Sequence, residues 1–452
     1  MISTSSLRVA GVATLVTFLG VSACARINSA SRAEVPPGIT KINHVVVIYL
    51  ENRSFDNMYG EFPGADGLDA ASHAPRQVST TGEVYATLPQ AAGQPYPTTL
   101  ENTPFDIAQF VPATVVTHDL VHKFYQEQAQ IHGGRMDKFA AVSDAQGQAL
   151  GFYHTSILPV AAEAANYTLC DRFFHSAFGS SFLNHQFLIS AAAPRFTEAT
   201  PALRALLDSV GGLVRDQPVT PDGFAVNTMY SVNSPHPSTA PATSLVPNQT
   251  HETIGDRLTD KDVSWAWYSG GWNDAIAGNP DRFFQYHHQP FAYFAKYADG
   301  TPGRALHLKD ESDFVAAAVA GTLPAVSFVK PIGYNNEHAG YADIMTGEKH
   351  TVQLINAIRN GPNWHDTAII ITYDENGGWW DHVAPPVVDR WGPGTRVPTI
   401  VISPYAKRHH VDHTVLETAS ILAFIEARWG LAPLSTHDAK AANMTSAFDF
   451  SQ

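Results

Sequence analysis

The chain has 452 residues, of which 44% are hydrophobic and only 15% are charged. This composition excludes a disordered protein and allows a sizeable core, within one large α/β domain that carries insertions. The net charge of −14 argues against nucleic acid as a partner, because such a chain repels a phosphate backbone. A small phosphorylated substrate could still bind where a metal supplies local positive charge.

The N-terminus has the pattern of an export signal. Arg8 is the only charged residue among the first 23, and residues 9–21 form a mostly apolar stretch that is too short to span a bilayer. The sequence Val-Ser-Ala-Cys that ends at Cys24 resembles a bacterial lipobox, in which this cysteine is lipidated and becomes the first residue of the mature protein. The alternative is ordinary cleavage after Ala23 or Ala25.

Three segments are therefore expected. Residues 1–23 would be a signal peptide, residues 24–40 a tether and residues 41–452 a single domain. The protein would be exported, either to the periplasm or outer membrane as a lipoprotein tethered through Cys24, or as a secreted protein. The second cysteine, Cys170, lies in an apolar context and is predicted to be a buried structural thiol.

Continuous apolar runs predict strands that are buried on both faces. The strongest runs lie at residues 42–50, 367–373 and 397–404, and shorter candidates lie at residues 263–268 and 325–329. Helical patterns occur between them, at residues 350–359 and 418–429. Strands that alternate with helices predict an α/β fold with a mostly parallel sheet. Residues 61–110 and 195–250 are rich in Pro, Thr, Ser and Ala, and are predicted to be insertions or long surface loops.

Polar pairs follow the two strongest strands. Glu51-Asn52 comes directly after the first strand, and Asp374-Glu375 comes directly after residues 367–373. Ligands of open α/β sheets bind beyond the carboxyl ends of the strands, and carboxylate and amide oxygens suit a divalent metal. The alternatives are a turn or helix cap for the first pair and a solvated acidic turn for the second.

Serine and histidine supply the remaining candidates. Ser180 and Ser181 follow Gly179 among apolar residues, so they could cap a helix, or one could be a nucleophile activated by a neighbouring metal. The chain has 21 histidines, of which three or four are expected near the chemistry. The candidates near glycine, aspartate or apolar turns are His118, His122, His132, His287, His288, His338, His350 and His382.

Missing motifs narrow the reaction class. The sequence contains no G-x-x-x-x-G-K-[ST], no G-x-S-x-G and no H-E-x-x-H. These absences argue against a P-loop NTPase, an α/β-hydrolase esterase and a zinc metalloprotease of that type.

Two longer motifs resemble a known family. Residues 51–56 (ENRSFD) resemble the first signature of the bacterial phosphoesterase family, and residues 373–386 (YDENGGWWDHVAPP) resemble its second signature. The stretch around Asp137 matches a third recurring segment. This family contains secreted acid phosphatases and non-zinc phospholipases C, and it is a branch of the alkaline-phosphatase-like superfamily. The resemblance covers residues 42–430 and implies a three-layer α/β sandwich with a mostly parallel central sheet and loop insertions.

The resemblance also implies site residues. One metal ion, which could be Mg, Mn, Ca, Zn or Fe, would be bound by Glu51, Asn52, Asp374, Glu375 and Ser181. Ser181 would also be the nucleophile that forms a phosphoserine. The phosphoryl pocket would be lined by His118, His287, His288 and His338, with His350 or His382 close behind.

The branch of the family is indicated by one departure. Phospholipases C usually show Gly-Pro-Ser/Thr-x-Pro-Asn-Arg at the nucleophile, whereas residues 179–185 lack both prolines and end in His185. The tandem His287-His288, and the end of the chain soon after the catalytic domain, also favour an acid phosphatase that hydrolyses phosphomonoesters.

Two other functions are kept as alternatives. A phospholipase C that hydrolyses choline phospholipids would need an aromatic cage for the quaternary ammonium group, for which the candidates are Trp265, Trp267, Trp272, Trp379 and Trp380. The last alternative is a non-catalytic lipoprotein that binds phosphate or metal.

Overall fold

The structure is a computed structural model that describes Met1 and residues 35–452. Cys24, the signal peptide beyond Met1 and most of the tether lie outside the described residues, so the division into 1–23, 24–40 and 41–452 stays a prediction. Within the part of the chain that is described, no helix is both long enough and apolar enough to cross a bilayer.

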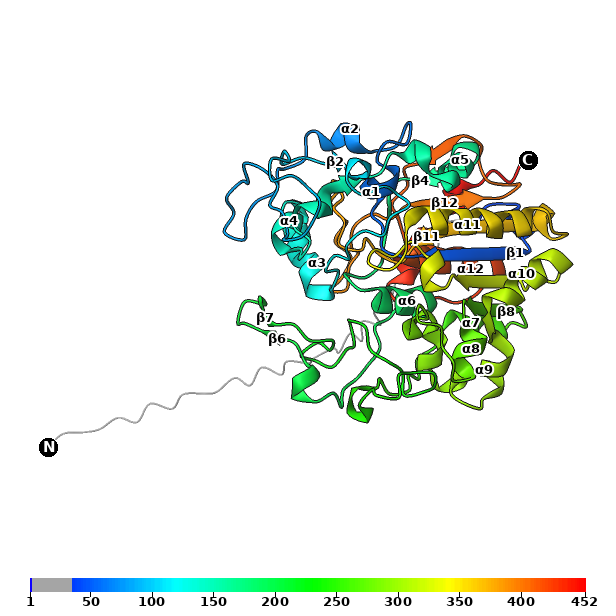
Figure 1. The fold of residues 1–452 in the computed structure, drawn as a ribbon. Coiled ribbons are helices and arrows are strands. Elements are labelled where there is room, and N and C mark those ends of the chain that lie inside the picture. The colour runs from blue at the N-terminus through cyan, green and yellow to red at the C-terminus, as the bar shows by residue number, and fades with distance from the viewer. Residues whose placement is uncertain (2–34) are drawn as a thin grey trace.

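An eight-stranded sheet forms the centre of the molecule, in the order β13-β4-β12-β11-β1-β10-β8-β9 (Figure 1). Its strands are β1 (His44–Leu50), β4 (Thr168–Cys170), β8 (Trp265–Ser269), β9 (Leu308–Asp310), β10 (Val326–Lys330), β11 (Thr367–Tyr373), β12 (Thr399–Ile402) and β13 (His410–Asp412). β1 lies between β10 and β11 and runs parallel to both. Only β12 runs antiparallel to its two neighbours, β11 and β4, so the predicted α/β fold with a mostly parallel sheet is confirmed.

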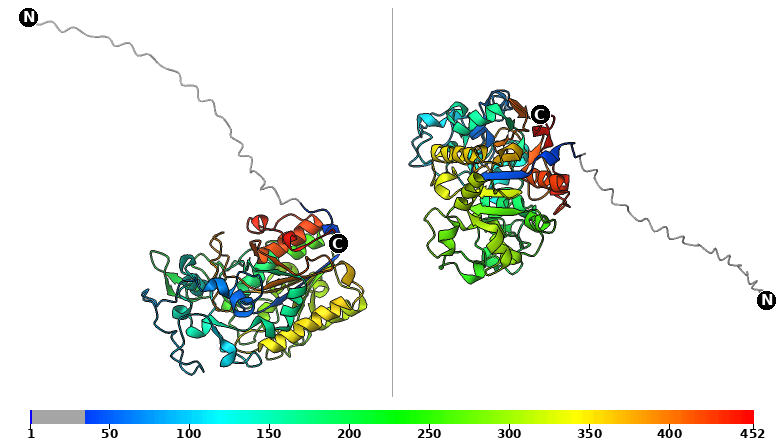
Figure 2. Two further views of the ribbon diagram at one scale, coloured as in Figure 1. Left: turned by 90° about the horizontal axis from the view of Figure 1, so that it is seen from above. Right: turned by 90° about the vertical axis from the view of Figure 1, so that its right-hand side faces the viewer.

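Helices cover both faces of this sheet. The long helix α11 (Ile344–Arg359) lies on one side and α12 (Thr418–Trp429) on the other, as the left view of Figure 2 shows. α5 (Pro159–Asn166) and α10 (Glu311–Ala320) pack against α11, and α6 (Ser181–Ser190) packs against α12. The remaining helices are α1 (Phe55–Tyr59), α2 (Leu68–Ala71), α3 (Phe124–Ile131), α4 (Phe139–Val142), α7 (Ile254–Thr259), α8 (Trp272–Ile276) and α9 (Pro302–His307).

Long connections carry only short elements. Residues 61–110 contain α2 and the two-residue strand β2 (Phe105–Asp106), which pairs with β3 (Gly151–Phe152). Residues 195–250 contain the hairpin of β6 (Leu206–Leu207) and β7 (Leu213–Arg215). A further pair joins β5 (Phe173–Phe174) to β14 (Leu416–Glu417). These segments agree with the predicted loop insertions.

The strongest sequence patterns formed the core. The side chains of β11 are all buried, as are those of β1 from Val45 to Leu50. The continuous β-branched runs explain this, since both faces of these strands pack against helices. Cys170 is also buried and forms no disulfide, as predicted.

Candidate active site

The two polar pairs meet because their strands are neighbours. In the parallel register of β1 and β11, Leu50 lies opposite Tyr373, so Glu51 and Asp374 leave the sheet side by side. The backbone N–H of Asn52 donates a hydrogen bond to Asp374 Oδ1 at 3.1 Å. All four predicted ligand residues in these pairs are fully buried.

Gly377 permits this close approach. A Cβ at position 377 would lie 2.5 Å from the carbonyl oxygen of Asn52 and 2.6 Å from its Cβ, and the φ angle of Gly377 is +61°. Both the contact and the backbone conformation exclude a larger residue without movement of Asn52. The glycine that follows Asp374-Glu375 in the second signature therefore shapes the site through its lack of a side chain.

Ser181 lies at the centre of these groups. It is the first residue of α6, and its hydroxyl oxygen is 3.1 Å from Glu51 Oε2, 3.4 Å from Asn52 Oδ1 and 3.5 Å from Glu375 Oε1. The neighbouring Ser180 hydroxyl instead donates to the carbonyl of Val226 at 3.0 Å. Of the two serines, only Ser181 therefore has its oxygen among the acidic side chains.

The cluster holds excess buried negative charge. Burial, followed by repulsion from Glu51, raises the pKa of Asp374 well above its ordinary value, and burial followed by repulsion from Asp374 does the same for Glu375. Burial alone would also raise the pKa of Glu51, but the ammonium group of Lys330 and the ring of His288 hold it well below its ordinary value. Lys330, fully buried at the end of β10, forms an ion pair with Glu51.

Three histidines lie beside Glu51. His288 Nε2 is 3.0 Å from Glu51 Oε1. The ring of His288 stacks on that of His185 with centroids 5.2 Å apart, and the ring of His287 lies edge-on to both. Burial lowers the pKa of His185 and His287 well below the ordinary value and lowers that of His288 to about 4. These rings are therefore neutral and can accept a hydrogen bond or bind a metal.

Two further histidines lie on the side of Asn52 and Glu375. His122 Nε2 is 3.2 Å from Asn52 Nδ2 and 3.7 Å from Glu375 Oε1. His338 lies next to it, with ring centroids 5.7 Å apart, and stacks on Tyr341.

His118, expected in the phosphoryl pocket, is not part of this cluster. Its side chain is exposed, and its backbone carbonyl accepts a hydrogen bond from Gln148 at 2.7 Å. His122 takes the place beside Asn52 instead. The two histidines lie four residues apart in a segment without regular structure, so no periodicity indicated which would face inward.

His350 and His382, of which one was expected close behind the phosphoryl pocket, both contact residues outside the cluster around Ser181. His350 pairs with Glu311. His382 contacts Asp56 at 2.7 Å, in a buried network that includes the ion pair of Arg396 with Asp381. This network joins the two signatures structurally, because Asp56 belongs to the first and His382 to the second.

Two residues of the cluster, Lys330 and His185, were not predicted to belong to the site. A lysine at the end of a buried strand was the signal for Lys330, since a buried cation needs an anionic partner. His185 was noted only as a departure from the family motif, and it lies one helical turn after Ser181 on α6.

The residues present fit a metal ion. Glu51, His185 and His288 bring ligand atoms within 4.8 Å of one another. Two buried atoms here, His185 Nε2 and Asp374 Oδ2, have no hydrogen-bond partner. Buried carboxylates with unused oxygens beside neutral imidazoles are the donor set of a divalent cation site.

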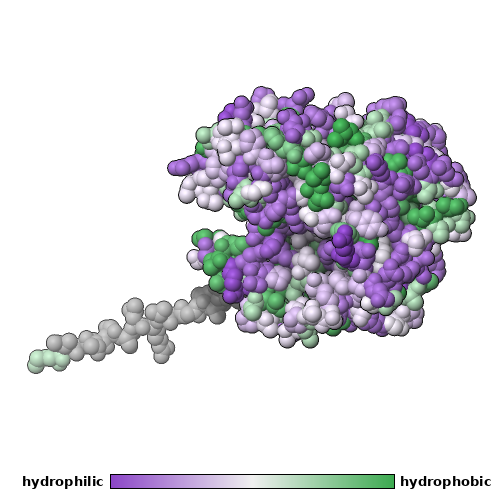
Figure 3. Space-filling view, viewed as in Figure 1, coloured by the Kyte–Doolittle hydropathy of each residue, from purple (hydrophilic) through white to green (hydrophobic). Residues whose placement is uncertain are grey.

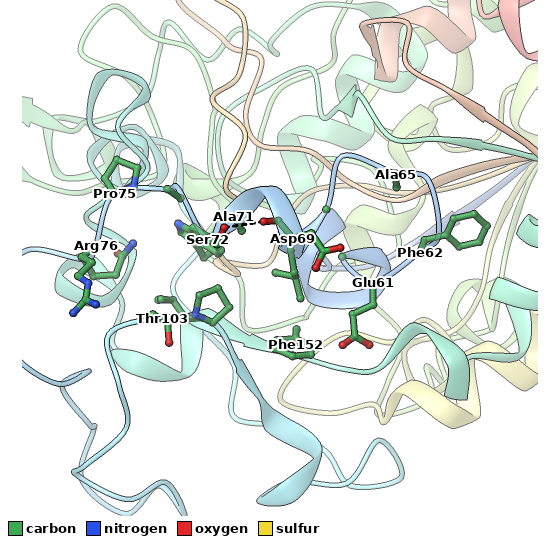
Figure 4. A pocket seen from close by; sticks show the side chains of 18 of the residues that line it. Glu61, Phe62, Ala65, Asp69, Ala71, Ser72, Pro75, Arg76, Thr103 and Phe152 are labelled. Atoms are coloured by element: carbon green, nitrogen blue, oxygen red, sulfur yellow. Dashed lines mark hydrogen bonds between the residues drawn. The ribbon is translucent and has the colours of Figure 1, made fainter.

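A cavity of about 670 Å³ opens beside the cluster. It is lined by His122 and Ser180, together with residues 119–123 and 216–218, so it lies directly next to Asn52 and Ser181. A separate cavity of about 620 Å³ lies around α2 (Figure 4), where Phe62, Asp69 and Phe152 contribute to the lining. That second cavity contains none of the predicted metal ligands or histidines, although Trp380 lines it.

Comparisons with known proteins identify the family of the chain. The model of the phosphoesterase family matches residues 42–432. Phospholipase C A of Mycobacterium tuberculosis is 27% identical over 92% of this chain and 78% of its own length. Non-hemolytic phospholipase C of Pseudomonas aeruginosa is 24% identical over 90% of this chain and 57% of its own.

Among solved structures, a protein in the alkaline phosphatase superfamily from Vibrio parahaemolyticus aligns with 76% of this chain and 74% of its own. The identity is 8% and the TM-score is 0.36. The family match spans both signature motifs and every residue placed in the cluster. The chain therefore belongs to the phosphoesterase family and is a phosphoric ester hydrolase.

Proposed function

We propose that the protein is a metal-dependent acid phosphatase, in which the hydroxyl oxygen of Ser181 attacks phosphorus and forms a covalent phosphoserine. The observation that supports this most strongly is the position of that oxygen, 3.1 Å from Glu51 Oε2 and 3.5 Å from Glu375 Oε1 in a buried acidic cluster. A metal ion held by these carboxylates would lie beside the serine hydroxyl and activate it. The acidic pH optimum rests on the resemblance to the acid phosphatase branch.

One metal ion would be held by Glu51, Asn52, Asp374 and Glu375, with Ser181 as the fifth ligand. When bound, it would lower the pKa of the serine hydroxyl and offset the charge of the phosphoryl group. Because the side chain of His288 also reaches Glu51 Oε1, this histidine either joins the ligand set or contacts a phosphoryl oxygen.

Residues of the chain would carry out the phosphoryl and proton transfers. The serine would react as its alkoxide, having released its proton to solvent when the metal lowered its pKa. The serine oxygen forms a bond to phosphorus while the bond to the leaving oxygen breaks, and that oxygen takes a proton from a protonated histidine, for which His122 and His338 are the candidates. Water then attacks phosphorus and returns a proton to that histidine, which releases inorganic phosphate and regenerates the serine alkoxide. Ser181 begins α6, so the positive end of the helix dipole favours the phosphoryl charge at this position.

The tryptophans favour a monoester over a choline diester. The five candidates for an aromatic cage are all buried, with exposed fractions of 4% or less. Trp265 stacks on His307, and Trp267 stacks on Phe328 within the core. Trp265 and Trp267, used for packing in this way, cannot enclose a quaternary ammonium group, whereas Trp380 also lines the separate cavity around α2.

A phospholipase C-type diesterase is the second candidate. The similarity to phospholipases C of Mycobacterium tuberculosis and Pseudomonas aeruginosa supports it. The third, a non-catalytic protein that binds phosphate or metal, predicts no turnover even after metal is restored.

Parallel assays separate these candidates. The mature chain is tested with p-nitrophenyl phosphate and with p-nitrophenyl phosphorylcholine, each with and without added divalent metals. We expect faster turnover of the monoester, and near-complete loss of it in Ser181→Ala but not in Ser180→Ala. Faster turnover of the choline diester would replace the phosphatase by the second candidate.

Export remains part of the proposal, with Cys24 as a lipid attachment site or with cleavage nearby. The mass of the N-terminal peptide of the mature protein distinguishes a lipidated Cys24 from a chain that begins after Ala23 or Ala25.

A further inference from the structure

The hairpin β6–β7 exposes aliphatic side chains that no core residue covers. Leu206, Val210, Leu213 and Val214 are exposed by 50%, 88%, 38% and 60%. None of them belongs to a hydrophobic cluster of the described residues. Single exposed aliphatic residues are common on protein surfaces, but four within ten residues need a physical reason.

The turn of this hairpin is held in place. The backbone N–H of Asp208 donates to the carbonyl of Gly212 at 2.8 Å. The carboxylate of Asp208 accepts hydrogen bonds from the N–H groups of Val210 at 2.9 Å and Gly212 at 2.7 Å. These hydrogen bonds hold the apolar tip at Val210 in place before any partner binds. Less conformational entropy is therefore lost when the hairpin docks.

The hairpin leads directly into the wall of the cavity beside the acidic cluster. β7 ends at Arg215, and the next residue, Asp216, lines the cavity of about 670 Å³ that His122 also lines. Asp216 pairs with Lys123 at 3.3 Å, which ties the base of the hairpin to the opposite wall. In Figure 1 the hairpin projects from the left of the molecule, and Figure 3 shows an apolar surface at that position.

We propose that the β6–β7 hairpin docks the enzyme onto the surface of a lipid aggregate with zwitterionic or uncharged headgroups, so that a lipid-borne phosphate ester can enter the cavity. This inference rests on the proposed phosphoester hydrolysis and specifies where the substrate is presented.

Charge and size favour a lipid surface over other occupants. The hairpin has one acidic residue, Asp208, and one basic residue, Arg215, so it offers no net attraction to an anionic surface, and the chain as a whole carries −14. Four aliphatic side chains cannot cover the roughly 800 Å² per partner that a stable protein interface buries. They suffice for shallow insertion at a lipid–water boundary.

Paired serine substitutions test the proposal. They remove apolar surface without changing charge or touching the core. All proteins are the mature chain with Cys24→Ser, so that no acyl chain can anchor them. The test variant is Val210→Ser/Val214→Ser. The control is Leu306→Ser/Val319→Ser, which removes two side chains that are exposed by 64% and 65% on α9 and α10, at the opposite end of the molecule in Figure 1.

Binding is measured by co-sedimentation with phosphatidylcholine vesicles. We expect the unsubstituted chain and the control to bind alike, and the test variant to bind at least tenfold more weakly, since each buried valine contributes about a tenfold factor. Turnover of soluble p-nitrophenyl phosphate should be the same in all three. Failure of the proposed phosphatase would appear only in this soluble assay.

Three results would overturn the docking proposal. They are no binding to phosphatidylcholine, equal binding of the test variant, and binding only to vesicles of anionic phosphatidylglycerol. Sedimentation equilibrium tests the remaining alternative, in which the hairpin contacts a second copy of the chain. A dimer that the test variant abolishes would assign the hairpin to that contact and overturn lipid docking.

Discussion

The replacement Gly377→Ala tests how closely the two strand ends must approach. The new Cβ would lie 2.5 Å from the carbonyl oxygen of Asn52, at a φ of +61°. The positive φ costs about 1–2 kcal/mol for a residue with a side chain. Displacement of Asn52 adds about 1–3 kcal/mol of strain. Because Asn52 is a proposed metal ligand, we expect weaker metal binding and a large fall in kcat along with the loss of stability.

Gly93→Ala is the matched control, because Gly93 has a φ of +83° and nothing within 4 Å of the new Cβ. It should incur only the cost of the positive φ and leave turnover unchanged. The assay compares the urea midpoint, kcat and the apparent metal dissociation constant of the two variants. If Gly377→Ala matched Gly93→Ala in all three, the close approach to Asn52 would have no part in building the site.

Three further predictions follow from the site and its surroundings. His122→Ala should lower kcat/KM by about 10²–10⁴, in the range of a lost proton donor, while His118→Ala should stay within about twofold of the unsubstituted enzyme; equal effects would remove His122 from the proposed role. Removal of metal by a chelator should abolish turnover and lower the melting temperature, and both should return with added metal, because the buried carboxylates would otherwise repel one another; a melting temperature that does not change would argue against a metal bound in the cluster. Burial alone would lower the pKa of His437, but hydrogen bonds with Asp389 and Glu417 raise it to about 10. This folded-state value lies above the unfolded value of about 6.5, so the stabilisation is fully present below pH ~6.5 and is lost as the pH rises through ~10. His437→Gln should therefore lower the free energy of unfolding by a few kcal/mol at pH 6, by a margin that shrinks at higher pH, and a margin that is constant with pH would refute this.

The fold was predictable where the sequence pattern was strong. Residues 367–373 and 418–429 form β11 and α12 at the predicted bounds, because their apolar residues are continuous or periodic over the whole element. The three-residue strands β4, β9 and β13 gave no comparable pattern. Strand order and the antiparallel direction of β12 depend on contacts between distant segments, which local periodicity does not record.

The site residues that directly follow strands were predictable from the sequence. Glu51 and Asp374 could be paired because acidic residues end two buried strands, and β1 and β11 turned out to be neighbours. The role of Ser181 was predicted from the family motif alone. A serine at the start of a helix is common and by itself does not indicate a nucleophile. His122 and Lys330 could not be chosen in advance, because the direction of a loop histidine and the partner of a buried lysine are set by tertiary packing.

Direct detection of the covalent intermediate tests the central claim. The enzyme is quenched with acid during turnover of p-nitrophenyl phosphate, and the peptide that contains Ser180 and Ser181 is analysed by fragmentation mass spectrometry. The account predicts a phosphoryl group on Ser181, and no phosphorylated peptide from Ser181→Ala. A phosphoryl group on Ser180 or on a histidine, with Ser181 unmodified, would contradict it.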